Sequence, residues 1–139
     1  KTMINNYAKN HLLPAPDKKK YSKEHLLLLI YIYYYKSILS IGDIQSLLEP
    51  LTQRYFHKDG EMNMQSIYEE VFSLEKEQVE KMKQDVTEKY ETASRIFPEA
   101  EAEDQEFLRI FSFICLLSFD VYVKKQVIEK LIDELPKKS

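Results

Sequence analysis

The sequence predicts an all-α protein. Only two glycines, Gly42 and Gly60, occur in 139 residues, which favours long uninterrupted helices over turns between strands. Apolar residues recur at three- and four-residue intervals through most of the chain, as on the buried side of a helix. Seven Phe and ten Tyr supply large core side chains, and a hydrophobic content of 44% is ordinary for a globular protein.

Residues 1–52 are expected to form a small helical head. A first helix presents Ile4, Tyr7 and Ala8 on one side and ends before Pro14, because the residue preceding a proline is pushed toward extended geometry. Residues 17–21 form a short basic loop. We also expect native residues upstream of Lys1.

Two further helices complete the predicted head. Ser22 should cap a helix that is apolar on every side from residue 26 to 35 and therefore buried. Ser40 should cap the next helix, in which Pro50 predicts a kink or an early stop.

Residues 53–62 form a polar linker, and residues 63–139 are expected to be a helical body. A helix from 63 to about 97 repeats an apolar residue every seven positions, a moderate coiled-coil signal. Pro98 breaks it, and a last helix runs from about 100 to 135. Joined by a short turn, the two most simply form a long antiparallel hairpin.

The charge of the chain is distributed unevenly. Residues 1–58 carry nine Lys and Arg against four Asp and Glu, a balance of +5. Because the whole chain has a net charge of −3, the remainder carries −8. A basic head on an acidic body is typical of nucleic-acid binders.

Enzyme chemistry is not expected. His11, His25 and His57 are scattered without metal-ligand spacing, and no Gly-rich phosphate loop or nucleophile elbow occurs, so we expect no metal and no cofactor. Cys115 has no disulfide partner, which fits a reducing cytoplasm. The longest apolar run, residues 107–119, falls short of the ~20 residues that a bilayer span needs, so we expect no membrane association.

Four short stretches carry a resemblance to a known family: residues 4–7 (INNY), 12–14 (LLP), 21–24 (YSKE) and 39–44 (LSIGDI). In this pattern, residues 3–51 resemble the DNA-binding domain of the MerR family. The whole chain is most similar to an uncharacterised MerR-like family of unknown function from low-GC Gram-positive bacteria. The resemblance implies a winged helix-turn-helix head whose first helix is absent from this chain. It also implies a homodimer.

The predicted function is that of a DNA-binding transcriptional regulator acting as a homodimer on duplex DNA. Asparagine can pair bidentately with adenine, and lysines in the loop suit phosphate contacts, which position a protein without reading sequence. The predicted DNA-binding residues are Thr2, Asn5, Asn6, Lys9, Lys18, Lys19, Lys20 and Lys23.

The dimer is expected to form through the last helix, which is apolar on more sides than one neighbour can cover. Its predicted interface residues are Phe107, Ile110, Phe111, Phe113, Ile114 and Leu117. No effector can be read from the sequence, whether small molecule or protein. The alternative is a helical protein-interaction module that keeps the same fold without binding DNA and uses residues 107–119 to hold a partner helix.

Overall fold

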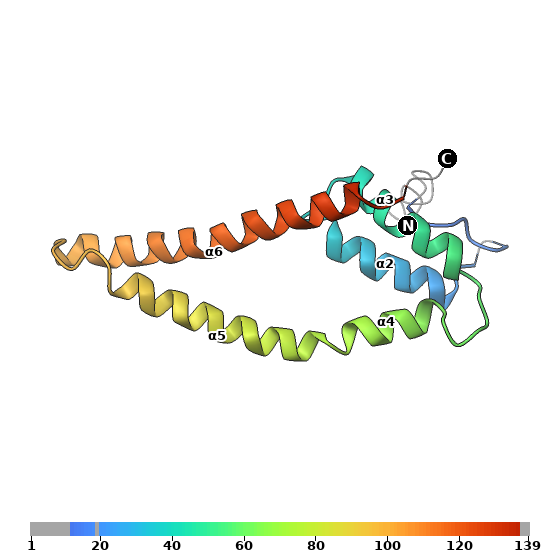
Figure 1. The fold of residues 1–139 in the computed structure, drawn as a ribbon, viewed down its shortest axis with the longest axis horizontal. Helices are drawn as coiled ribbons and strands as arrows, with labels where there is room; N and C mark the ends of the chain where they lie inside the picture. The colour runs from blue at the N-terminus through green and yellow to red at the C-terminus, as the bar shows by residue number, and fades with distance from the viewer. Residues whose placement is uncertain (1–11, 19, 137–139) are drawn as a thin grey trace. The chain divides into compact units, whose positions relative to one another are not determined.

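The computed structural model describes residues 12–18 and 20–136, and over these residues it is helical, without a strand (Figure 1). The all-α prediction is confirmed. The five helices described are α2 (Lys23–Tyr35), α3 (Ile41–Tyr55), α4 (Met64–Phe72), α5 (Glu75–Ser94) and α6 (Ala102–Asp133).

The chain divides into two compact units. Unit 1 comprises Lys1–Phe72 and Val127–Ser139, and unit 2 comprises Ser73–Gln126. Unit 1 therefore holds α2, α3, α4 and the C-terminal turns of α6, whereas unit 2 holds α5 and the longer first part of α6.

Ser22 and Ser40 begin α2 and α3 as predicted. The Ser22 hydroxyl accepts the backbone N–H of His25 at 3.3 Å, and the Ser40 hydroxyl accepts that of Asp43 at 3.1 Å. Each bond satisfies one of the backbone donors that a helix leaves unpaired at its start. Local sequence thus sets where both helices begin.

One prediction for these helices is wrong, and one of two alternatives is excluded. The helix α2 is not buried on every side, because Tyr33 and Tyr34 are exposed while Leu28 and Ile32 are completely buried. Pro50 does not stop α3, which continues to Tyr55. The carbonyl that loses its N–H partner belongs to Ser46, which is exposed and so open to water.

The core of unit 1 joins segments that lie far apart in the sequence. Leu12 and Leu13 pack with α2, α3 and α4, and Ile132 of α6 closes the same cluster. Each such side chain contributes about 1.5–3 kcal/mol when it is fully buried. An aromatic group extends this core, with Tyr31 of α2 lying 5.9 Å from Phe72 of α4 between ring centroids.

The predicted single helix from 63 to 97 is wrong. The structure has two helices, α4 and α5, separated at Ser73 and Leu74. Asn63 and Ser66 cap α4 reciprocally, each side chain accepting the other's backbone N–H. Phe72, the last residue of α4, packs on Tyr31 and Tyr34 of α2, a contact that local propensity does not reveal.

Unit 2 contains α5 and most of α6 in contact. The ring of Tyr90 lies 5.4 Å from that of Phe113, edge to face, and Ala93 of α5 is almost fully buried. The last helix, predicted from about 100 to 135, is confirmed as α6. Among the described helices, none is both long and apolar enough to cross a bilayer.

Candidate functional site

The loop before α2 presents part of the predicted DNA-binding set. The backbone N–H of Lys20 donates to the carbonyl of Asp17 at 2.9 Å, closing a tight turn in which Lys18 has a φ of 49°. Lys18, Lys20 and Lys23 are exposed. The remaining predicted contacts, Thr2, Asn5, Asn6, Lys9 and Lys19, lie outside the described residues.

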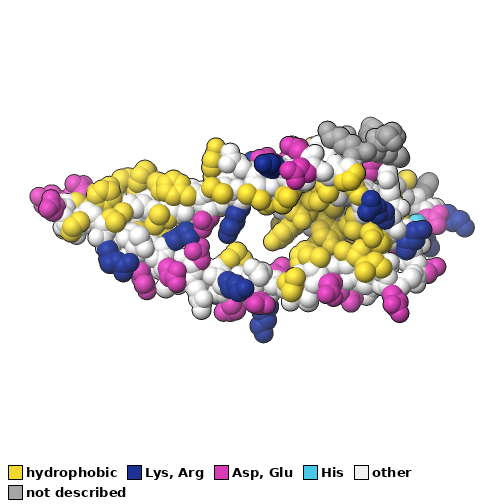
Figure 2. Space-filling model, in the orientation of Figure 1, with side chains coloured by type: hydrophobic (Ala, Val, Ile, Leu, Met, Phe, Trp, Pro, Cys, Tyr) yellow, Lys and Arg dark blue, Asp and Glu magenta, His cyan; other side chains and the backbone are white. Residues whose placement is uncertain are grey.

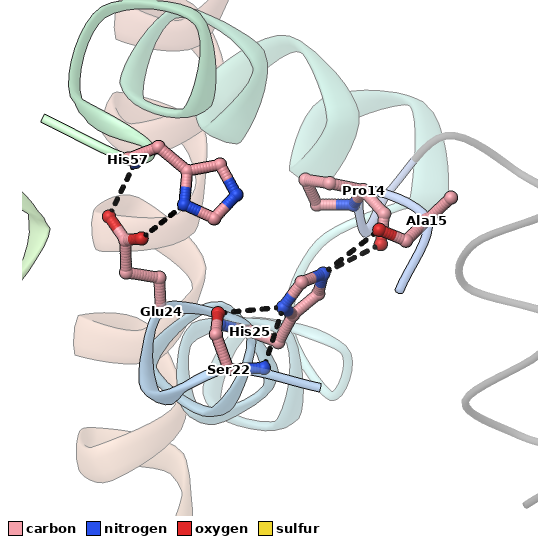
Figure 3. Close-up of polar contacts among 6 residues, drawn as sticks. All are labelled: Pro14, Ala15, Ser22, Glu24, His25 and His57. Carbon is pink, nitrogen blue, oxygen red and sulfur yellow. Dashed lines mark hydrogen bonds and ion pairs between the residues drawn. The ribbon is translucent and has the colours of Figure 1, made fainter. Parts of the chain in front are cut away.

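The buried side chain of His25 links the segment before α2 to the first turn of that helix (Figure 3). The backbone N–H of Ser22 donates to Nδ1 of His25 at 3.0 Å, and Nε2 lies 3.0 Å from the carbonyl oxygen of Pro14 and 3.3 Å from that of Ala15. A carbonyl can only accept, so Nε2 carries the ring proton and donates it. His25 is 1% exposed, and it acts as a structural link.

A second link joins the start of α2 to the segment after α3. Glu24 accepts the backbone N–H of His57 at 2.7 Å and lies 2.9 Å from Nδ1 of the same residue (Figure 3). His57 has a φ of 63°, a left-handed conformation that is uncommon for non-glycine residues. The sequence reasoning treated both histidines as scattered residues and missed both links.

The most prominent surface of unit 2 is apolar. Ten large hydrophobic side chains of α6 leave between 48% and 65% of their area exposed, and six of them gather on one side of the helix. Figure 2 shows hydrophobic side chains running along this helix. We call this surface the α6 face; it consists of Phe107, Ile110, Phe111, Ile114, Val121 and Tyr122.

The predicted dimer residues divide between two sides of α6. Phe107, Ile110, Phe111 and Ile114 lie on the α6 face. Leu117 is half-buried at the edge of the same face, beside Ile114 and Val121, whereas Phe113 packs on Tyr90 of α5. The structure therefore separates a side that α5 covers from a side that nothing described in unit 2 covers.

An ion pair crosses between the two helices of unit 2. Lys89 of α5 lies 2.7 Å from a carboxylate oxygen of Asp120 of α6 and also pairs with Asp85 one turn earlier. The hydrogen bond to Asp120 raises the pKa of Lys89 above its usual value, and the same bond lowers the pKa of Asp120. In the sequence, the i,i+4 spacing of Asp85 and Lys89 predicts the ion pair between these two residues but not the one between Lys89 and Asp120.

An open apolar groove of about 360 Å³ lies beside the α6 face. Ile96 and Phe97, from the segment after α5, and Phe111 and Phe119 of α6 line it, together with the half-buried thiol of Cys115. Its lining is suited to receiving apolar side chains. No group of three His, Cys, Asp or Glu side chains placed to hold a metal ion occurs among the described residues.

Comparison with known proteins identifies a family for the N-terminal half. No curated protein and no solved structure matches the chain. The family described as Domain of unknown function (DUF1836) matches residues 1–71, which is half of the 139 residues. The same comparison gives no match to the MerR family, so the predicted MerR assignment is wrong.

The physical reason for that error lies in the motifs themselves. The stretch YSKE contains the Ser22 cap that begins α2, and a proline such as that of LLP is a general signal for the end of a helix. Such signals occur wherever two helices meet. They describe local structure more than ancestry. The match over half of its length shows that the chain belongs to the DUF1836 family.

Proposed function

We propose that this protein acts by binding another protein through the α6 face, and that it has no catalytic role. The observation that carries this proposal is a contiguous row of exposed aromatic and branched apolar side chains on one side of α6. Proteins in water rarely expose an apolar patch above a few hundred Å² unless it is an interaction site.

The size of the α6 face supports this function. A fully accessible aromatic side chain presents about 150–250 Å², so a half-exposed one presents about 100 Å². The three aromatic members of the face, Phe107, Phe111 and Tyr122, therefore present about 300 Å², and Ile110, Ile114 and Val121 add to this area. Hydrophobic surface of this extent stabilises a complex when a partner covers it, at about 25 cal/mol per Å² before the costs of association.

Site-specific photo-crosslinking in cells tests the proposal. A photoreactive phenylalanine analogue replaces Phe111, and a matched control places it at Gln84, an exposed polar position of α5. We expect a crosslinked product of defined mass from position 111 and none from position 84. Absence of any protein product at position 111, and likewise at Ile114 and Val121, would contradict an interaction role for this face.

A second candidate function is binding of duplex DNA by unit 1, as a homodimeric transcriptional regulator. It is favoured by the exposed Lys18, Lys20 and Lys23 around the start of α2 and by the +5 balance of residues 1–58. These lysines suit phosphate contacts, which give salt-dependent affinity without base selection.

A further inference from the structure

We propose that the partner of the α6 face is a second copy of this chain, paired antiparallel about a two-fold axis that passes at Ile114. This inference rests on the proposed function and names the occupant of the same surface. Three observations carry it: the spacing of the apolar residues, the charges at the two ends of the face, and its area.

Four residues of the α6 face follow a heptad that Leu117 completes. Phe107, Ile114 and Val121 recur every seven residues, and Ile110 and Leu117 fill the intervening positions. This 3–4 alternation places all five on one stripe of the helix, as in helices that pair along their length. The stripe is exposed except at the half-buried Leu117.

An antiparallel register centred on Ile114 places apolar residues opposite one another at most levels of the stripe, and Ile110 lies opposite Ser118 of the partner subunit. Ile114 meets Ile114 of the partner subunit, and Phe107 meets Val121 of the partner subunit, since both lie seven residues from the centre. A two-fold arrangement repeats each contact on the other side of the axis, so one apolar stripe serves both chains.

The charges at the two ends of the stripe favour antiparallel over parallel pairing of the two α6 helices. Glu103 precedes Phe107 by one turn, and Lys125 follows Val121 by one turn, so both extend the same stripe. Asp104 and Lys124 lie beside them, and all four side chains are exposed. An antiparallel pair places the acidic end of each helix against the lysines of the other. A parallel pair would place like charges together, which is unfavourable.

The area agrees with a dimer. A stable interface buries about 800 Å² on each partner. The three aromatic side chains of the α6 face present about 300 Å² of this, and Ile110, Ile114 and Val121 add to it. Leu117, Ser118 and the aliphatic stems of Lys124 and Lys125 lie along the same stripe or at its edge and supply further area. A second copy therefore covers the face with residues that the chain itself provides.

Charge reversal tests the register with variants that leave the apolar core intact. The first variant carries Glu103→Lys and Asp104→Lys, the second carries Lys124→Glu and Lys125→Glu, and the third combines all four changes. Sedimentation equilibrium on the full chain should show dimer dissociation constants raised at least about tenfold in the first two and restored in the third. A fourfold variant as weak as the twofold variants would overturn the antiparallel register.

Disulfide trapping places the axis directly. In a Cys115→Ser background, Ile114→Cys should crosslink to itself on mild oxidation. Phe107→Cys alone should not, but it should crosslink when mixed with Val121→Cys. Self-crosslinking of Phe107→Cys would overturn the inference in favour of parallel pairing, and no disulfide in any mixture would overturn self-pairing.

The two proposals fail separately. If no disulfide forms while photo-crosslinking at position 111 attaches a different protein, the second-copy inference falls and the interaction role stands. If position 111 attaches nothing and the chain is a monomer at every concentration, both fall.

Discussion

The Nε2 atom of His25 lies 3.0 Å from the carbonyl oxygen of Pro14. This bond holds the segment before α2 against the first turn of the helix, while Nδ1 accepts the backbone N–H of Ser22. One buried ring thus joins the backbone of Ser22 to that of Pro14 and Ala15, and the adjoining Leu12 and Leu13 lie in the core of unit 1.

Replacing His25 with Ala should destabilise unit 1 by about 2–4 kcal/mol, because it leaves backbone groups unsatisfied and opens a cavity. His57→Ala is the matched control. His57 is exposed and pairs with Glu24 at the surface, so its loss should cost at most about 1 kcal/mol. Urea denaturation followed by circular dichroism measures both. Equal losses would show that the buried ring is not a structural link.

Lys89→Met should weaken the contact between α5 and α6 more than Lys81→Met does. Lys89 bridges Asp85 and Asp120, so its removal leaves these two carboxylates without the cation that joins them. Lys81 pairs only with Glu77, one turn away on the same helix, at 3.5 Å. Hydrogen exchange of the α5 amides in the two variants measures the difference. Equal protection of the α5 amides in the two variants would show that the Lys89 bridge does not hold α5 against α6.

The same bridge sets a pH window. The pKa of Asp120 is lowered in the folded chain. Its contribution to the free energy of unfolding is therefore present above the ordinary pKa of 3.8 and is lost only as the pH falls through the lower pKa of the folded state. The pKa of Lys89 is raised, so its contribution is present below 10.5 and is lost as pH rises through the higher folded value. NMR titration of the Asp120 carboxyl should show the depressed pKa, and Lys89→Met should return it toward the ordinary value. An unchanged titration would contradict the pairing.

Alkaline pH should destabilise unit 1 through Tyr31. Burial raises the pKa of Tyr31 above 10.0, and neighbouring Tyr35 and Tyr68 add to the shift. Above pH 10 the unfolded chain therefore loses a proton that the folded chain keeps, so the free energy of unfolding falls as pH rises. Tyr31→Phe should lose less stability between pH 9 and 11 than the unmutated protein. Tyr33→Phe, at an exposed position of the same helix, is the control, and identical pH slopes would refute the argument.

If unit 1 binds DNA, its affinity should fall with salt. Each phosphate neutralised contributes about −0.9 to the slope of log affinity against log salt. Changing Lys18, Lys20 and Lys23 to Ala should flatten the slope by up to about 2.7. The same change at Lys76, Lys81 and Lys83 of α5 should leave it unaltered. An unaltered slope in the variant of Lys18, Lys20 and Lys23 would show that these lysines do not contact DNA.

Local signals account for what the sequence predicted correctly. Ser22 and Ser40 mark helix starts because a cap is made with residues two or three positions away. The long apolar run of α6 marks a helix, and its periodicity already separates the Phe107 side from the Phe113 side. Only the latter packs on α5.

Contacts over long sequence separations account for what it missed. Phe72 at the end of α4 meets Tyr31 of α2, and no proline or glycine marks the break that follows it. His25 bonds a carbonyl eleven residues earlier, and Lys89 meets Asp120 on another helix. Composition and periodicity do not encode such pairings, and short turn motifs led to the wrong family.

The most direct test of the α6 face is the molar mass of the unmutated full chain in solution, measured by light scattering at micromolar concentration. We predict the mass of two chains. Phe111→Asp should give one folded chain, because a charge buried in an apolar contact costs several kcal/mol and raises the dissociation constant at least about a hundredfold. Gln84→Asp should remain a dimer. A folded monomer for the unmutated protein would contradict the pairing of two chains through α6.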